Sequence, residues 1–166
     1  MAKKLKFPEK LAKYLAKAKV KHSILEHKTV YTAYDTAATM GKKLNEVVKT
    51  LLVAADKDYY LAILPADHNL DFKKLAREIS KKAGKKIKAV KIPGEAVMEK
   101  LLKVKAGAMS AFGGLYKLPV VMEKNLVKIK KAIFASGSFN HSIEMAVKDF
   151  IKLEKAILGS FGVKKK

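Results

Sequence analysis

A single lysine lies inside an otherwise apolar stretch of this sequence. Residues 47–55 are Val, Leu and Ala except for Lys49 and Thr50, and such a run predicts a strand buried on at least one face. A lysine near the start of a buried strand either extends its ammonium group to water or points it into a polar cavity. In a cavity, the charge would meet an anion or polarise a carbonyl group. The stretch alone leaves both interpretations open.

Two further polar stretches could contribute to the same cavity. Residues 105–117 contain three glycines among small side chains, which is typical either of a tight connection or of a loop whose backbone approaches another group closely. Residues 136–142 carry three serines and a histidine after a predicted strand. Because strand ends in α/β folds often converge on a pocket, we expect these stretches to meet near Lys49. Such a pocket lacks a strong nucleophile and suits polarising a carbonyl or holding a ribose-phosphate end.

Several other kinds of chemistry are excluded by the motifs. The sequence contains no GxxxxGK[ST] phosphate loop, no GxGxxG after a predicted strand and no GxSxG turn. It has no cysteine, and its four histidines lack metal-site spacing. We therefore expect no metal and no cofactor, and we interpret His22, His27, His68 and His141 as surface or hydrogen-bonding residues.

The charge indicates a polyanionic partner. There are 36 basic and 15 acidic residues, giving a formal net charge of +21, which favours binding to RNA or DNA. The alternative is a lysine-rich surface without a specific partner. Only Arg77 is an arginine, so phosphate contacts are expected rather than bidentate reading of bases. No apolar run approaches the roughly 18 residues of a membrane span, and we expect a cytoplasmic protein without a membrane partner.

The periodicity of apolar residues predicts one α/β (α+β) domain over 1–166, with basic tails at 1–6 and 162–166. We expect a mixed, mainly antiparallel, curved sheet flanked by helices. Thr32 and Asp71 are predicted to cap helices, and the strands at 47–55 and 59–64 to form a hairpin. The other elements are helices at about 9–19, 32–40, 72–83, 95–102 and 147–158, and strands at about 23–26, 86–91, 118–122, 132–135 and 143–145.

The order of these features resembles the YbaK / prolyl-tRNA editing superfamily from about residue 23 to residue 158. The resemblance is carried by helix 32–40, by Val48-Lys49-Thr50-Leu51-Leu52-Val53, by Leu70-Asp71 with Lys74-Leu75-Ala76, by the loop from Gly107 to Gly114, and by Ile143-Glu144-Met145 after a Ser-Gly pair. It implies a YbaK-like fold and a trans-acting hydrolase of mischarged aminoacyl-tRNA. The implied partners are the tRNA acceptor end and an aminoacyl-tRNA synthetase.

The resemblance also assigns residues. Lys49 matches the family's hallmark lysine and Gly107 the first glycine of its GxxxP loop, so both are the expected catalytic positions. Ala111 replaces the proline of that loop, which favours an alternative reading as a non-catalytic RNA- or tRNA-binding module of the same fold. A third reading is a binder of small nucleotides. The expected substrate-binding residues are Thr32, Thr50, Ser110, Ala111, Phe112, Ser136, His141 and Ser142.

Overall fold

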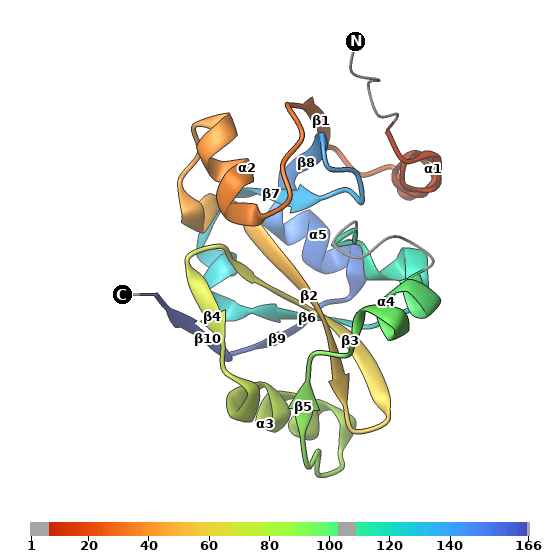
Figure 1. Cartoon of the computed structure of the whole chain (residues 1–166), viewed down its shortest axis with the longest axis vertical. Helices are drawn as coiled ribbons and strands as arrows, with labels where there is room; N and C mark the ends of the chain where they lie inside the picture. Colours follow the sequence, from red (N-terminus) through yellow and green to blue (C-terminus); the bar gives the residue numbers. More distant parts are fainter. Residues whose placement is uncertain (1–6, 103–108, 166) are drawn as a thin grey trace.

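The computed structural model describes residues 7–102 and 109–165 (Figure 1). Its largest sheet has five strands in the order β5-β2-β3-β6-β9 and mixes antiparallel with parallel pairs. A three-stranded sheet, β1-β8-β7, and a two-stranded sheet, β10-β4, are antiparallel. The strands are β1 Ser23–Glu26, β2 Val48–Ala55, β3 Asp58–Pro65, β4 His68–Leu70, β5 Val90–Lys91, β6 Val120–Glu123, β7 Lys131–Ala135, β8 His141–Ala146, β9 Ile157–Gly159 and β10 Gly162–Lys164.

Two of the α-helices begin at residues that the sequence marks as caps. The Thr32 hydroxyl accepts a hydrogen bond from the Asp35 N–H at 3.0 Å, and the Asp71 carboxylate accepts one from the Lys74 N–H at 3.0 Å. Gly41 follows the first of these two helices with φ of +65°, a conformation that glycine adopts without strain. The helices are α1 Glu9–Ala18, α2 Ala33–Met40, α3 Phe72–Ala83, α4 Glu95–Leu102 and α5 Val147–Glu154.

The five-stranded sheet forms the middle layer, with a hydrophobic cluster on each face. Leu52, Leu61 and Ile63 pack on one side with buried residues of α1 and α5. On the other side, their neighbours Val53 and Leu64 pack with residues of α3. Alternate residues of a strand face opposite sides, so the continuous apolar run of β2 reflects burial on both faces. The central strands of the sheet are therefore packed on both faces.

The mixed α/β class and the antiparallel β2–β3 hairpin are confirmed. Several elements differ from the prediction. The last helix stops at Glu154 because Lys155 is left-handed, with φ of +50°, and residues 157 and 158 lie in β9, parallel to β6. Only Val90–Lys91 of the expected 86–91 strand pairs with β2. Residues 113–116 of the expected glycine loop form a 3₁₀ turn, while Gly107 lies outside the described residues.

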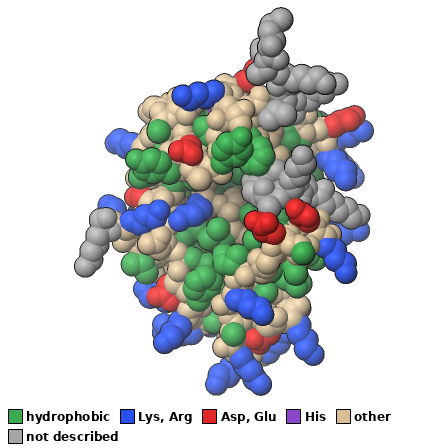
Figure 2. Space-filling view, in the orientation of Figure 1, with side chains coloured by type: hydrophobic (Ala, Val, Ile, Leu, Met, Phe, Trp, Pro, Cys, Tyr) green, Lys and Arg blue, Asp and Glu red, His purple; other side chains and the backbone are tan. Residues whose placement is uncertain are grey.

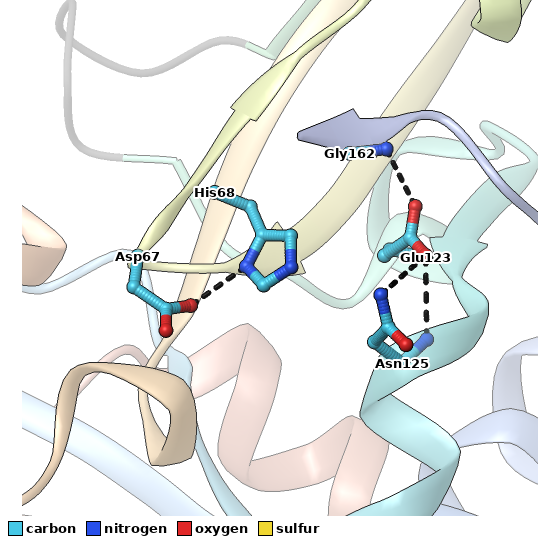
Figure 3. A network of polar contacts seen from close by, with 5 residues as sticks. All are labelled: Asp67, His68, Glu123, Asn125 and Gly162. Carbon is cyan, nitrogen blue, oxygen red and sulfur yellow. Dashed lines mark hydrogen bonds and ion pairs between the residues drawn. The ribbon is translucent and has the colours of Figure 1, made fainter. Parts of the chain in front are cut away.

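The expected tail at 162–166 is also wrong in part, because Gly162–Lys164 forms β10 against β4. A buried carboxylate holds this strand (Figure 3). Glu123 is 1% exposed, and its Oε2 accepts the N–H groups of Phe161 at 2.7 Å and Gly162 at 2.5 Å. Its Oε1 accepts hydrogen bonds from the backbone and side-chain nitrogens of Asn125. Each carboxylate oxygen thus accepts two hydrogen bonds. Composition alone does not indicate that Glu123 binds the backbone of the last strand.

A second carboxylate attaches α1 to the rest of the fold. Glu154 accepts hydrogen bonds from the Tyr14 hydroxyl at 2.6 Å and from the Gly114 N–H at 2.8 Å. Burial raises the pKa of both Glu154 and Tyr14 above their ordinary values. A Cβ on residue 114 would overlap the Tyr14 hydroxyl, so this contact requires the glycine. Within the described residues, no helix combines the length and the apolar character needed to cross a membrane.

Candidate functional site

A pocket of about 590 Å³ lies where β2 and β7 diverge. The two strands meet in a parallel bridge between Val47 and Ile133 and then separate. The amino-terminal turn of α2 and the segment 92–95 after β5 complete the pocket wall. The pocket thus lies between the five-stranded and the three-stranded sheets. Of the residues predicted to form the site, it brings together Thr32, Lys49, Thr50, His141 and Ser142.

The backbone of β2 faces this pocket with an unpaired edge. The Ala66 N–H donates to the Val47 carbonyl at 2.8 Å, and hydrogen-bonded pairs alternate along an antiparallel ladder. Val47 and Ala66 therefore form a hydrogen-bonded pair, and Thr50 and Ile63, three positions further along the register, form a non-hydrogen-bonded pair. The backbone N–H and C=O of Thr50 thus point away from β3. On its other side, β2 pairs with β5 only at Ala54 and Ala55. No described strand pairs with the N–H and C=O of Thr50, which are left for a ligand.

The side chain of Thr50 adds a second unsatisfied group. Its Oγ1 is buried and has no hydrogen-bond partner among the described residues. A buried hydroxyl without a partner costs about 1–3 kcal/mol, so such groups are rare without a reason. Together with the strand edge, Thr50 supplies two donors and two acceptors at the pocket. This combination can bind a ribose hydroxyl or a carbonyl oxygen.

Lys49 extends from the opposite face of β2, since adjacent residues of a strand alternate. It lines the pocket and is half-buried, and no described carboxylate forms an ion pair with it. Burial lowers the pKa of the Lys49 ammonium from its ordinary value, and repulsion by Lys165 lowers it further, while Asp67 raises it. The Lys49 ammonium group therefore has an attractive carboxylate in Asp67 but no ion pair among the described residues. Such a group can bind an anion or a developing negative charge.

The opposite wall carries two pairs of a hydroxyl and an imidazole. Ser142 Oγ lies 2.9 Å from His27 Nε2, and His27 Nδ1 lies 2.8 Å from the Lys28 carbonyl oxygen. Because a carbonyl can only accept, Nδ1 of His27 carries the proton, and the Ser142 hydroxyl donates to Nε2 when the ring is neutral. The lone pairs of Ser142 then remain available. Ser138 Oγ lies 2.9 Å from His141 Nδ1, and because the Ser138 hydroxyl donates to Asn140 Oδ1 at 2.7 Å, it accepts the hydrogen bond from His141.

Apolar side chains form the remainder of the pocket. Figure 2 shows such side chains gathered over the middle of this face of the molecule. Met98 from α4, Met109, and Phe134 from β7 line the pocket. Tyr31 and Phe139 also line it and contact each other, with ring centroids 4.9 Å apart. An apolar side chain of a ligand would be accommodated here, beside the polar edge of β2.

Four of the expected site residues are buried away from the described pocket lining. Ser110, Ala111, Phe112 and Ser136 are each at most 1% exposed. The Ala111 N–H donates to the Ala135 carbonyl at 3.0 Å, and the Ser136 hydroxyl donates to the His141 carbonyl at 2.7 Å. These residues support the strands behind the pocket. The catalytic position predicted at Gly107 lies outside the described residues.

Sequence reasoning missed several residues of the wall. His27 reaches the pocket because β1 pairs with β8 in the register that places Glu26 opposite His141. Ile92, Gly94 and Glu95 reach it through the pairing of β5 with β2. Both approaches depend on contacts between segments distant in sequence. No local pattern indicates them.

The sequence matches the family described as "Aminoacyl-tRNA editing domain" over residues 27–153. The chain belongs to this family. The match includes α2, the whole of β2 and the β7–β8 wall, so every residue that lines the described pocket lies within the editing domain. This finding confirms the resemblance to the YbaK-like superfamily that the order of sequence features indicated.

Solved structures support the YbaK-like fold of this editing domain. A crystal structure of a hypothetical protein, APE2540, has a TM-score of 0.80 at 19% identity and covers 93% of this chain and 100% of its own. A protein proposed to be a trans-editing enzyme for prolyl tRNA synthetase has a TM-score of 0.74 at 19% identity, covering 95% and 96%. At this identity the likeness shows the fold. The sequence matches none of the curated proteins compared with it.

Proposed function

We propose that this editing domain is a trans-acting deacylase that hydrolyses the ester of a mischarged aminoacyl-tRNA, of the kind that edits tRNA for proline. The reaction adds water across the bond between the amino-acid carbonyl and the terminal ribose. Free amino acid and tRNA with a free ribose hydroxyl are the products. The proposed setting is the cytoplasm, with the tRNA acceptor end and a synthetase as partners.

The observation that carries this proposal is the pair of unsatisfied groups at the start of β2. Lys49 is a half-buried ammonium without an ion-pair partner among the described residues. Thr50 has a buried hydroxyl without a hydrogen-bond partner among them. Structural polar groups are normally satisfied inside the fold. In an editing domain, these two groups fit a substrate that brings both a phosphate and a ribose ester.

The proposed mechanism uses water as the nucleophile. Lys49 holds the phosphate or ribose of the terminal adenosine and stabilises the negative charge that develops on the ester. Thr50 orients the ester through its hydroxyl and backbone edge, while the apolar wall receives the amino-acid side chain. Ser142, with its proton directed at His27, can accept from the α-ammonium group of the aminoacyl moiety. Water attacks the carbonyl carbon, the bond to the ribose oxygen breaks, and that oxygen takes the proton.

The alternative is a tRNA-binding module of the same fold that has lost catalysis, and Ala111 is its support. The buried position of this residue bears on the choice. Ala111 uses its N–H in a bond to Ala135, a bond that proline could not make, and it does not line the described pocket. Its identity therefore changes the support of the wall rather than a described lining atom, which favours the catalytic reading.

Replacing Lys49 by alanine tests the proposal. We expect K49A to lose at least about a hundredfold in deacylation rate, the usual effect of removing one group that stabilises developing charge, with an unchanged unfolding midpoint. The assay follows single-turnover hydrolysis on a panel of tRNAs charged with different amino acids, including mischarged tRNA for proline. Lys131→Ala is the matched control, since Lys131 is an exposed strand lysine outside the described pocket lining.

Two outcomes would count against the proposal. Hydrolysis by K49A at the parent rate would remove Lys49 from the site. Salt-sensitive binding of every charged tRNA by the parent protein, without turnover of any, would support the non-catalytic module instead.

A further inference from the structure

A second groove lies between α3 and the segment that leads into β5. Its volume is about 960 Å³, larger than that of the candidate site. Figure 2 shows basic side chains gathered around the lower part of the molecule, where Figure 1 places α3 and β5. The basic residues that line it are Lys73, Arg77, Lys81, Lys85, Lys86 and Lys88. We call this surface the α3–β5 groove.

We propose that the α3–β5 groove binds the phosphate backbone of the RNA whose charged end enters the candidate site. This inference rests on the proposed function only in taking that RNA to be tRNA. The charge, the apolar floor and the position of the groove support it separately.

The charges of the groove suit a polyanion. Arg77, the only arginine of the chain, lies here, and its guanidinium group can contact a phosphate with two parallel hydrogen bonds. Lys73, Arg77 and Lys86 are exposed, and none forms an ion pair within the described part of the chain. Basic side chains free of acidic partners gain most from neutralising phosphates, because the binding releases counterions.

The acidic residues close to the groove do not cancel this charge. Asp58 forms an ion pair with Lys85 at 3.0 Å. The Asp56 carboxylate accepts the N–H groups of Lys88 and Ala89, each at 3.0 Å, and these bonds lower its pKa. Asp56 thereby fixes the segment that forms one side of the groove. Glu78 of α3 lies near Lys81 at 3.8 Å.

The floor of the groove suits an unpaired base. Phe72, at the first turn of α3, is 41% exposed and lines the groove with Ile87 and Val90. Surfaces that bind single-stranded nucleic acid commonly combine basic side chains with an aromatic ring on which a base stacks. Phe72 supplies such a ring beside Lys73 and Arg77.

The position of the groove connects it to the candidate site. Residues 85–90 line the groove and residues 92–95 line the pocket of the candidate site, so β5 and its flanking residues form part of both walls. The exposed Lys91 lies between the two sets. A chain with its end at Thr50 could therefore continue across β5 into the groove. An acidic protein could also bind the basic side chains, but its binding would not require the groove to adjoin the candidate site.

Reversing two charges of the groove tests the inference. Lys73→Glu/Arg77→Glu removes basic groups from α3, and the matched control Lys148→Glu/Lys152→Glu makes the same charge change on α5. Each pair lowers the formal charge by four from +21. Fluorescence anisotropy with uncharged tRNA measures binding, so hydrolysis is not required for the readout. Thermal unfolding checks that each variant folds.

We expect the groove variant to weaken tRNA binding by at least about tenfold and to reduce the slope of log K against log salt by about one to two, while the α5 control changes both far less. With charged tRNA, KM should rise while hydrolysis of an aminoacyl-adenosine ester stays at the parent rate. Equal tRNA binding by the groove variant and the α5 control would overturn the proposal that the groove binds RNA, even if the parent protein deacylates tRNA. Selective loss of binding in a protein that hydrolyses no substrate would support the groove and reject the proposed deacylase.

Discussion

Glu123 and the Lys49–Thr50 pair are both polar interruptions in strands of the same sheet, but their surroundings differ. Glu123 at the end of β6 has two hydrogen-bond donors for each carboxylate oxygen. Lys49 and Thr50 at the start of β2 have no ion pair and no hydroxyl partner, respectively, among the described residues. The carboxylate is the more buried group and the better satisfied one.

This difference separates structural from functional polarity better than burial does. A buried charge is tolerated when hydrogen bonds replace its hydration, and Glu123 meets that condition by fixing two backbone groups of the last strand. The β2 groups meet it incompletely, because Lys49 has no ion pair and Thr50 Oγ1 no hydrogen-bond partner among the described residues. A substrate that supplies the missing partners would account for their presence.

The two regions are also neighbours. Lys165 follows β10, and its N–H donates to the Asp67 carbonyl at 2.8 Å. Lys165 and Asp67 are the charges that act on Lys49. The strand that Glu123 holds in place therefore helps to set the electrostatic environment of Lys49. Substitutions in either region therefore test whether the two regions differ in their roles.

The largest expected effect is on stability, at Glu123. Glu123→Ala should lower the free energy of unfolding by about 3–5 kcal/mol, because the N–H groups of Phe161 and Gly162 lose their acceptor in a buried setting. Glu123→Gln keeps the volume and one acceptor oxygen, and should cost less. Urea unfolding measures both. A loss for Glu123→Ala no larger than that for K49A would end the distinction between the two regions.

The next effect is the pH dependence of the site. Because burial lowers the pKa of Lys49 below its ordinary value of 10.5, the ammonium loses its proton at a lower pH in the folded protein than in the unfolded chain. Deacylation, divided by the uncatalysed rate at each pH, should therefore fall on the alkaline side with an apparent pKa below 10.5. Over the same interval, the unfolded chain binds more protons, so the contribution of Lys49 to stability rises with pH.

Lys49→Arg provides the control for this profile, since a guanidinium group stays charged throughout. The remaining activity of this variant should lack the alkaline decrease. A profile that is the same for lysine and arginine would show that another group titrates.

Local patterns predicted the elements that carry the site. Thr32 and Asp71 mark helix starts in the structure as the sequence indicated, because capping depends on residues within one turn. The nearly continuous apolar run at 47–55 likewise located the first strand of the β2–β3 hairpin. Lys49 and Thr50 stood out because they interrupt a buried run.

The rest of the architecture depends on pairing between distant segments. Ile157 and Leu158 continue the apolar period of α5, yet they pair with β6 because the left-handed Lys155 turns the chain first. Gly162–Lys164 looks like a basic tail, and Glu123, 39 residues earlier than Gly162, makes it a strand. His27 reached the pocket for the same reason. Such contacts have no periodic signal in the local sequence.

The smallest effect is at the Thr50 hydroxyl, and its sign is informative. Thr50→Val replaces the unpartnered hydroxyl by a methyl group of similar size, so it should raise the free energy of unfolding by about 0.5–1.5 kcal/mol by removing a desolvation cost. Deacylation should fall about fivefold to tenfold if that hydroxyl meets the substrate, as expected for one hydrogen bond. Urea unfolding and single-turnover hydrolysis give the two values.

Thr36→Val is the matched control, because the Thr36 hydroxyl lines the same pocket but already donates to the Thr32 carbonyl at 3.0 Å. Its loss should lower stability slightly and leave hydrolysis nearly unchanged. If the free energy of unfolding rises for Thr50→Val and falls for Thr36→Val, the same pocket contains one functional and one structural hydroxyl. If Thr50→Val instead destabilises the protein as Thr36→Val does, the Thr50 hydroxyl has a partner within the fold, and only Lys49 would remain on the functional side of the comparison.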